Sequence, residues 1–246
     1  MSQLDLSSVA GVTPRHISFI ETGRAAPSRE MLDTLANALD MPLRDRNDLY
    51  LAAGYAAPYR ELGLDDPELA DARLAVERIL TNHEPFPAVV MDRHWNLLQA
   101  NRAARELFAA MLDLDRLPQP ANVLELVFDP EGLRPHILDW DRLAPALLAR
   151  ARREAVGHVL DADLAARVTR LEQALDGQPV PSGRSGPLID VAFTIDGVEH
   201  RFFSTVTTLG TPLDITLQEI RIELFHPADP DTRARYERAA GDSLHI

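Results

Sequence analysis

Three side chains near the start of the chain, Arg15, Ser18 and Phe19, are of the kinds that contact base edges when a helix enters a DNA groove. They lie within five residues, so in a helix they would share its N-terminal turns. A second set would support them, chiefly at the phosphate backbone: Gln3, Thr13, His16, Arg24 and Arg29. We therefore expect a nucleic-acid interface here, provided that the local structure presents these side chains outward.

The surrounding residues predict a helix, a tight turn and a second helix. Gly11 suits the turn because glycine adopts a positive φ without steric cost. Thr13 is a good N-cap, and Pro14 suits the first helical position. The second helix would bury Ile17 and Ile20 and leave Arg15 and its neighbours facing outward. An ordinary helical hairpin of an all-α protein would show the same features, so this segment alone leaves both interpretations open.

Two further helices are predicted after this pair. Ser28 would cap one that buries Met31, Leu32, Leu35, Ala36 and Leu39 at helical spacing. The other runs from about residue 44 to 53 and carries Leu49, Tyr50 and Ala53.

This succession, with its Glu21-Thr22-Gly23-Arg24 step and its Pro27-Ser28 continuation, resembles the lambda-repressor-like (XRE) helix-turn-helix family. The resemblance implies operator binding in double-stranded DNA. Members place another helix before the one that starts here near Gln3, and we expect the true start to lie upstream. The alternative is a truncated chain with an incomplete DNA-binding domain. In either case the N-terminal domain of the chain as numbered should be poorly covered. We expect it to expose one or more of four apolar residues: Leu4, Leu6, Ile17 or Leu35.

The composition bounds the class of protein. The chain has 246 residues, no cysteine and a net charge of −13, which at first sight opposes DNA binding. Residues 1–60, however, hold six arginines against seven acidic residues, so most of the excess acid lies later. No signal peptide or spanning segment is evident, and we expect a bacterial, cytoplasmic protein.

The sequence gives little support for an enzyme. The eight histidines are scattered without metal-ligand spacing, and no serine lies in a Gly-x-Ser-x-Gly motif. We expect no enzyme, no catalytic residue, no metal and no cofactor.

Residues 59–84 are expected to form a linker with a helix at 67–82. The pattern then changes to a hairpin of two short strands, 87–92 and 95–100, after which Asn101 caps a helix through Leu112. Residues 122–176 read as helices, chiefly 139–157 and 164–175, and 178–186 as a loop. Strands are predicted at 189–195, 202–209 and 215–225, with a two-residue turn at Asp196-Gly197. In the last strand Glu219, Arg221 and Glu223 would share one face.

The expected fold class is α+β. An all-α lambda-repressor-like helix-turn-helix domain (1–58) precedes a PAS-like domain (85–240) with a five-stranded antiparallel sheet and helices. The segments 87–95 and 201–229, including Arg221-Ile222-Glu223-Leu224-Phe225-His226-Pro227, resemble the MmyB-like regulators. That resemblance implies transcriptional regulation and a fatty-acid-like ligand.

Aromatic side chains in the second domain could line an apolar cavity between its sheet and its helices: Trp95, Phe108, Trp140, Phe193 and Phe202. Arg102 and Arg201 could bind a ligand carboxylate, because arginine binds carboxylates bidentately. Plain core packing of the aromatic residues and surface exposure of the arginines are the alternatives. We predict a homodimeric, ligand-responsive transcription factor; the alternative is a truncated ligand-sensing or dimerisation protein that no longer binds DNA.

Overall fold

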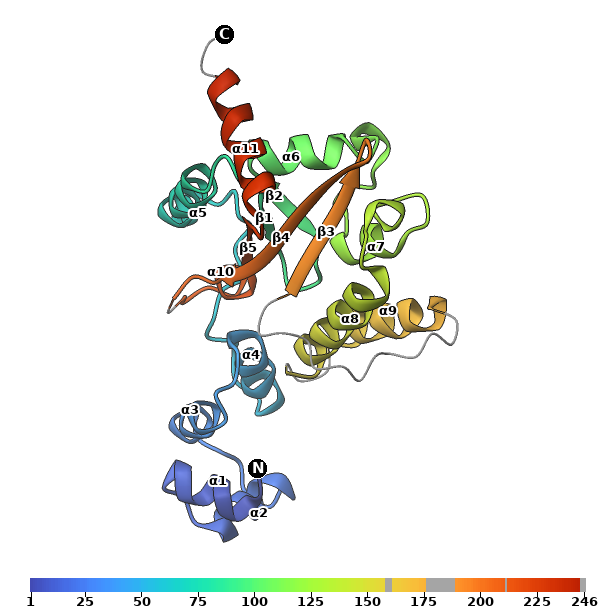
Figure 1. Cartoon of the computed structure of the whole chain (residues 1–246). Helices are drawn as coiled ribbons and strands as arrows, with labels where there is room; N and C mark the ends of the chain where they lie inside the picture. Colours follow the sequence, from blue (N-terminus) through green and yellow to red (C-terminus); the bar gives the residue numbers. More distant parts are fainter. Residues whose placement is uncertain (158–160, 176–188, 211, 244–246) are drawn as a thin grey trace. The chain divides into compact units, whose positions relative to one another are not determined.

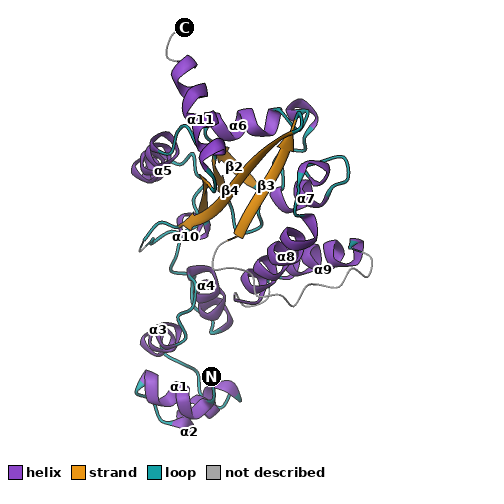
Figure 2. Ribbon diagram, viewed as in Figure 1, coloured by secondary structure: helices purple, strands orange, loops and turns teal. Residues whose placement is uncertain are grey.

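The computed structural model describes residues 1–157, 161–175, 189–210 and 212–243, and the loop predicted at 178–186 lies outside them. The chain divides into two compact units. Residues 1–63 together with 210–218 form the first unit, and the remaining residues form the second. Figures 1 and 2 show the helical first unit and the sheet-containing second unit.

The first unit contains the predicted helices, α1 (Gln3–Ala10), α2 (Pro14–Glu21), α3 (Arg29–Ala38) and α4 (Leu43–Ala52). Gly11 ends α1 with a φ of 65°, as the turn requires. Thr13 and Ser28 cap α2 and α3 by accepting hydrogen bonds from the backbone N–H groups of His16 and Met31. The helix–turn–helix prediction is therefore confirmed at its turn and at both caps.

The core of the first unit is built from α2, α3 and α4. Ile17, Leu32, Leu35 and Tyr50 are buried there. The expectation that Met31 and Leu39 are buried as well is wrong. Met31 is half-buried, and Leu39, which is 43 % exposed, is the C-cap of α3 and lies beyond the last residue of its buried face.

The apolar residues expected to be exposed in this unit behave differently from one another. Leu4 of α1 is 69 % exposed, whereas Leu6 is half-buried. Ile17 and Leu35 are buried, so the remaining helices cover these two positions.

The prediction of a strand at 215–225 is wrong over the first half of that segment. Residues 215–219 form the short helix α10 (Ile215–Glu219), and only β5 (Arg221–Pro227) is extended. Asp214 explains the difference, because its side chain accepts a hydrogen bond from the N–H of Leu217 at 3.3 Å, and its carbonyl accepts one from Gln218. This N-cap starts a helix where the alternation of apolar residues indicated a strand.

The segment that contains α10 forms hydrogen bonds with α4 and with residues that follow α4 in the chain. The side chain of Asp214 accepts a hydrogen bond from Leu62 N at 3.0 Å, and Ile215 N donates to the carbonyl of Arg60 at 2.9 Å. The Oε1 atom of Gln218 accepts from Leu43 N, the first residue of α4, at 2.6 Å. Asp214 and Ile215 are buried. Residues 210–218 are thus an integral part of the first unit, although they connect two strands of the second.

The second unit contains one antiparallel sheet in the order β2–β1–β5–β4–β3. Its remaining strands are β1 (Ala88–Met91), β2 (Leu97–Ala100), β3 (Ile189–Ile195) and β4 (Val198–Thr207). Asp196 and Gly197 join β3 to β4 with φ values of 50° and 76°, the two positive angles of a type I′ turn. Because this turn is tight, β4 begins at Val198, four residues before the predicted start.

Helices cover the sheet on both faces. In Figure 1, α7 (Val123–Phe128), α8 (Trp140–Gly157) and α9 (Ala162–Ala174) lie on one side of the sheet, and α5 (Ala70–Asn82) is drawn on the other. Asn101 caps α6 (Arg102–Ala109), which ends three residues before the predicted end. The last described element is α11 (Pro230–Ser243), and single turns of 3-10 helix occur at Pro67–Leu69, Leu114–Arg116 and Arg134–His136.

The main core of the second unit fills the space between the sheet and α6–α9. Register places Val89, Val191 and Phe202 on the sheet face that looks into it. The predicted architecture, a helical region followed by a five-stranded antiparallel sheet with helices, is therefore confirmed. Among the described helices, none combines the length and the apolar character that crossing a membrane requires.

Candidate functional site

The N-terminal end of α2 presents a short polar face. Thr13 Oγ1 accepts a hydrogen bond from His16 N at 3.3 Å, and Pro14 occupies the first helical position. Arg15 is exposed, and its guanidinium lies 5.2 Å from the centre of the Phe19 ring, one turn later. This cation–π contact restricts the arginine while leaving its N–H groups available. Ser18 lies beside these two residues and is half-buried.

The expected phosphate-contacting residues are not equivalent. Arg24 is exposed just beyond α2. The side-chain amide of Gln3 donates to the Glu21 carboxylate, which links the start of α1 to the end of α2. The Arg29 guanidinium lies over the rings of Tyr50 and Tyr55, at 5.9 and 5.0 Å from their centres. Arg29 therefore also packs within the domain.

Tyr50 fixes α4 against α3. Its hydroxyl donates to the Asp33 carboxylate at 2.7 Å, and this bond, reinforced by burial, raises the pKa of Tyr50 to about 12. The hydroxyl stays protonated at any physiological pH, so the contact that holds the two helices together is constant.

The aromatic residues expected to line a ligand cavity are mostly core residues. Trp95, which is 2 % exposed, Phe193 and Phe202 belong to the main core. Phe108 and Trp140 pack against its edge, and the Trp140 ring contacts Phe128 edge to face at 5.0 Å. The structure thus brings these residues to the predicted place, but it packs them against one another and their neighbours.

Beside Trp95, the same sheet face carries charges. Arg150 of α8 donates to both Glu223 carboxylate oxygens of β5 at 3.3 Å and to Glu154 at 3.1 Å. Glu154 also accepts hydrogen bonds from Trp95 Nε1 and Arg221 Nη1, each at 3.0 Å. Burial acts to lower the pKa of Arg150, but the two carboxylates outweigh it and raise that pKa. Arg221 and Glu223 of the predicted polar face are therefore turned inward, whereas Glu219 lies in α10 and not in the strand.

The two arginines considered for a ligand carboxylate lie apart from the packed aromatic residues. Arg201 is on the opposite face of β4 from Phe202 and pairs with Glu199 at 2.7 Å. Arg102 pairs with Glu106 at 2.9 Å and with Glu84 at 3.3 Å.

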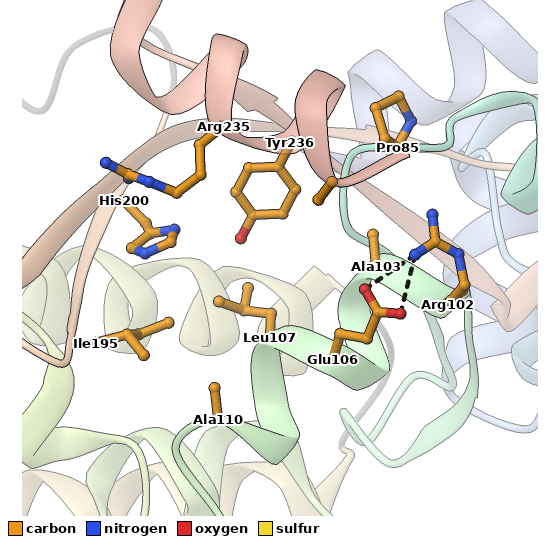
Figure 3. A pocket seen from close by; sticks show the side chains of 11 residues that line it. Pro85, Arg102, Ala103, Glu106, Leu107, Ala110, Ile195, His200, Arg235 and Tyr236 are labelled. Carbon is orange, nitrogen blue, oxygen red and sulfur yellow. Dashed lines mark hydrogen bonds and ion pairs between the residues drawn. The ribbon is translucent and has the colours of Figure 1, made fainter. Parts of the chain in front are cut away.

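A pocket of about 200 Å³ lies between α6, the turn-proximal ends of β3 and β4, and α11 (Figure 3). Its apolar walls include Leu107 and Ile195, and its polar residues include His200, Arg235 and Tyr236. None of the described residues that line it is one of the five aromatic residues expected from the sequence. Of the residues considered from the sequence, Arg102 lines it.

Sequence reasoning missed this pocket because it missed α11, although a signal was present. Asp229 caps the helix by accepting from Thr232 N at 2.8 Å, and Pro230 follows it, which is a common start signal. His200 could also have been placed, because it is two residues from Phe202 in one strand and so shares its face.

Comparison with known protein families covers most of the chain. Residues 1–45 match the helix-turn-helix family. Residues 72–239 match the family described as "MmyB-like transcription regulator ligand binding domain". The chain belongs to this family of MmyB-like transcription regulators. The two matches together identify a DNA-binding transcription regulator that responds to a ligand.

Other comparisons add little to the identity of this MmyB-like regulator. A solved structure titled "Structure of an RNA-binding Light-Oxygen-Voltage Receptor" is 14 % identical, with a TM-score of 0.30. The match covers 99 % of this chain and 57 % of that chain. No curated protein matches the chain.

Proposed function

We propose that this MmyB-like regulator binds an operator in double-stranded DNA with the N-terminal end of α2 in the major groove. Arg15, Ser18 and Phe19 face base edges. Contacts to the phosphate backbone come from a second set of residues: Gln3, His16, Arg24 and Arg29. Thr13 contributes by capping α2 and fixing the direction in which the helix starts.

The observation that carries this proposal is the geometry of Arg15. It is exposed at the first turn of a capped helix, and Phe19 restrains its guanidinium. A restrained guanidinium loses less conformational entropy when it forms the bidentate bonds by which arginine recognises guanine.

We infer that the functional form is a homodimer. Few arginines surround α2, and few phosphate contacts give a modest affinity for each copy. Two copies on one duplex would compensate for this, as in other helix-turn-helix proteins.

The proposed ligand of the second unit is an apolar small molecule, a fatty acid or related acyl compound. The resemblance to the MmyB-like regulators supports this class, and the sheet face directed toward α6–α9 is largely apolar. In this proposal, the bound ligand alters the relative placement of two DNA-binding domains in a cytoplasmic dimer.

Selection of binding sites from a pool of random duplexes tests the DNA part of the proposal. One sequence should be enriched, with two half-sites whose centres lie about 10 base pairs, or a multiple of this, apart. A single enriched half-site would contradict the dimer.

If the protein enriches no duplex but still binds an acyl compound, the proposed DNA binding is contradicted. It would favour the second candidate, a ligand-sensing or dimerisation protein.

A further inference from the structure

The pocket beside α11 has features that core packing does not explain. It is formed within the second unit alone, by residues of α6, β3, β4 and α11 (Figure 3). Its volume of about 200 Å³ is smaller than the ~300–1,000 Å³ typical of pockets for drug-sized ligands. A space of this size favours a small compound over a drug-sized one.

One part of the pocket is apolar. Leu107 and Ala103 of α6 face it, together with Ile195 of β3 and the ring of Tyr236. Water bound against such a wall makes few hydrogen bonds, and an apolar group of matching size would displace it favourably.

Two polar side chains of the pocket, His200 and Tyr236, lie beside this apolar wall. His200 Nδ1 is buried and has no hydrogen-bond partner in the part of the chain that the structure describes. The Tyr236 hydroxyl points into the space and likewise bonds to none of the described residues. Buried polar groups are normally satisfied, so the unpartnered His200 Nδ1, with the Tyr236 hydroxyl in the same pocket, indicates an exchangeable partner such as a ligand.

The charge beside these groups is positive. Arg235 donates to the carbonyl of Glu199 at 3.0 Å, a neutral acceptor, and no described carboxylate lies within ion-pair distance of it. The other ionic residues of the pocket, Arg102 and Glu106, pair with each other and are drawn on the opposite side from Arg235 in Figure 3. An anion is therefore favoured at the end that Arg235 occupies.

We propose that this pocket binds a small monocarboxylate. The carboxylate contacts Arg235 and the Tyr236 hydroxyl. The apolar body of the ligand packs against Leu107 and Ile195. The inference rests on the proposed ligand-sensing function and narrows it to short acyl chains or single aromatic rings. A long acyl chain would extend beyond the pocket.

Calorimetric titration of the full chain with hexanoate, benzoate, hexanamide and tetradecanoate tests this proposal. Hexanoate and benzoate should bind, and hexanamide should bind about tenfold more weakly because it lacks the charge. Arg235→Met keeps the apolar stem and should weaken hexanoate binding about tenfold, without changing hexanamide binding. Arg238→Met, at an exposed position of the same helix outside the pocket, is the matched control.

A second pair of variants tests the location without altering charge. Ala110 lines the pocket at the exposed end of α6, so Ala110→Trp should fill it and abolish hexanoate binding. Ala109→Trp, at an exposed neighbour that does not line the pocket, should have no effect.

The outcomes separate this inference from the proposed function. Tetradecanoate binding that survives both Arg235→Met and Ala110→Trp would overturn the pocket assignment and leave the acyl-sensing proposal intact. If Ala110→Trp abolishes hexanoate binding, the pocket assignment is supported. If hexanoate binds there but does not change the affinity for DNA, the proposed control of DNA binding by the ligand is contradicted. Absence of binding by every carboxylate would overturn the inference.

Discussion

Glu223 lies on β5 with only 7 % of its surface exposed, and Arg150 donates to both of its carboxylate oxygens. Two charges buried together cost solvation free energy that their mutual attraction returns only when both are present. The pair is therefore sensitive to the loss of either partner.

We expect Glu223→Ala to lower the free energy of unfolding of the second unit by about 3–5 kcal/mol, because it leaves the Arg150 guanidinium buried with one carboxylate fewer. Glu199→Ala, which removes an exposed partner of Arg201, should cost far less. Urea unfolding followed by tryptophan fluorescence measures both, since Trp95 and Trp140 lie in the second unit. Equal costs for the two variants would show that burial of the pair is unimportant.

His200 makes the stability of the second unit depend on pH. Burial, assisted by the charge of Arg235 and opposed by Asp229, holds the pKa of His200 below its usual 6.5. The unfolded chain therefore binds a proton more readily than the fold does. Stability is full above pH 6.5 and falls as the pH drops through 6.5 toward the folded pKa.

The variant His200→Gln should lose less stability between pH 7 and pH 5 than the parent protein, as measured by urea unfolding at each pH. His226, whose pKa is also lowered chiefly by burial, remains and continues to titrate in the variant. A parent and a variant that lose stability in parallel over this range would contradict the assignment.

At the scale of secondary-structure elements, α4 begins without a cap of its own. Pro42 occupies the N-cap position and its side chain makes no capping bond, while Gln218 Oε1 accepts from Leu43 N. A residue from a distant part of the sequence thus performs the role that Thr13 and Ser28 perform locally for α2 and α3.

We expect Gln218→Ala to destabilise α4 by about 0.5–2 kcal/mol, the usual cost of losing a helix cap. Amide hydrogen exchange should accelerate at Leu43 and in the first turn of α4. Gln173→Ala, at an exposed position of α9, is the matched control and should leave this exchange unchanged. Unaltered exchange at Leu43 in Gln218→Ala would mean that the bond contributes nothing.

The elements that sequence predicted well are those fixed by nearby residues. Thr13, Ser28 and Asn101 each cap a helix by accepting a hydrogen bond from the N–H group three residues later. Asp196-Gly197 closes a turn between adjacent strands. Such signals are local, so they can be recognised without knowledge of the fold.

The elements that sequence predicted poorly depend on distant partners. Residues 215–219 alternate like a strand, but Asp214 bonds to Leu62, 152 positions earlier, and also caps α10. The inward direction of Glu223 depends on Arg150, 73 positions away. The pocket beside α11 joins residues from both ends of the second unit, so periodicity within any one segment could not reveal it.

At the scale of the whole molecule, the chain passes between the two units at residues 63–64, 209–210 and 218–219. β4 and β5 are neighbours in the sheet, yet the segment that joins them belongs to the helical unit. In this regulator the helix-turn-helix unit therefore includes a connection between two strands of the MmyB-like ligand-binding domain.

The central claim, that this MmyB-like regulator recognises a specific operator through α2, is tested most directly by a ratio of affinities. Fluorescence anisotropy at one fixed salt concentration would compare the selected duplex with a scrambled duplex of equal length. We predict a preference of about 10³-fold or more for the selected duplex. Arg15→Ala should reduce that preference by the equivalent of about 1–3 kcal/mol, while Arg142→Ala, which removes an equally charged and exposed residue of the second unit, should not. Equal affinity for the two duplexes, or an unchanged preference in Arg15→Ala, would contradict the account.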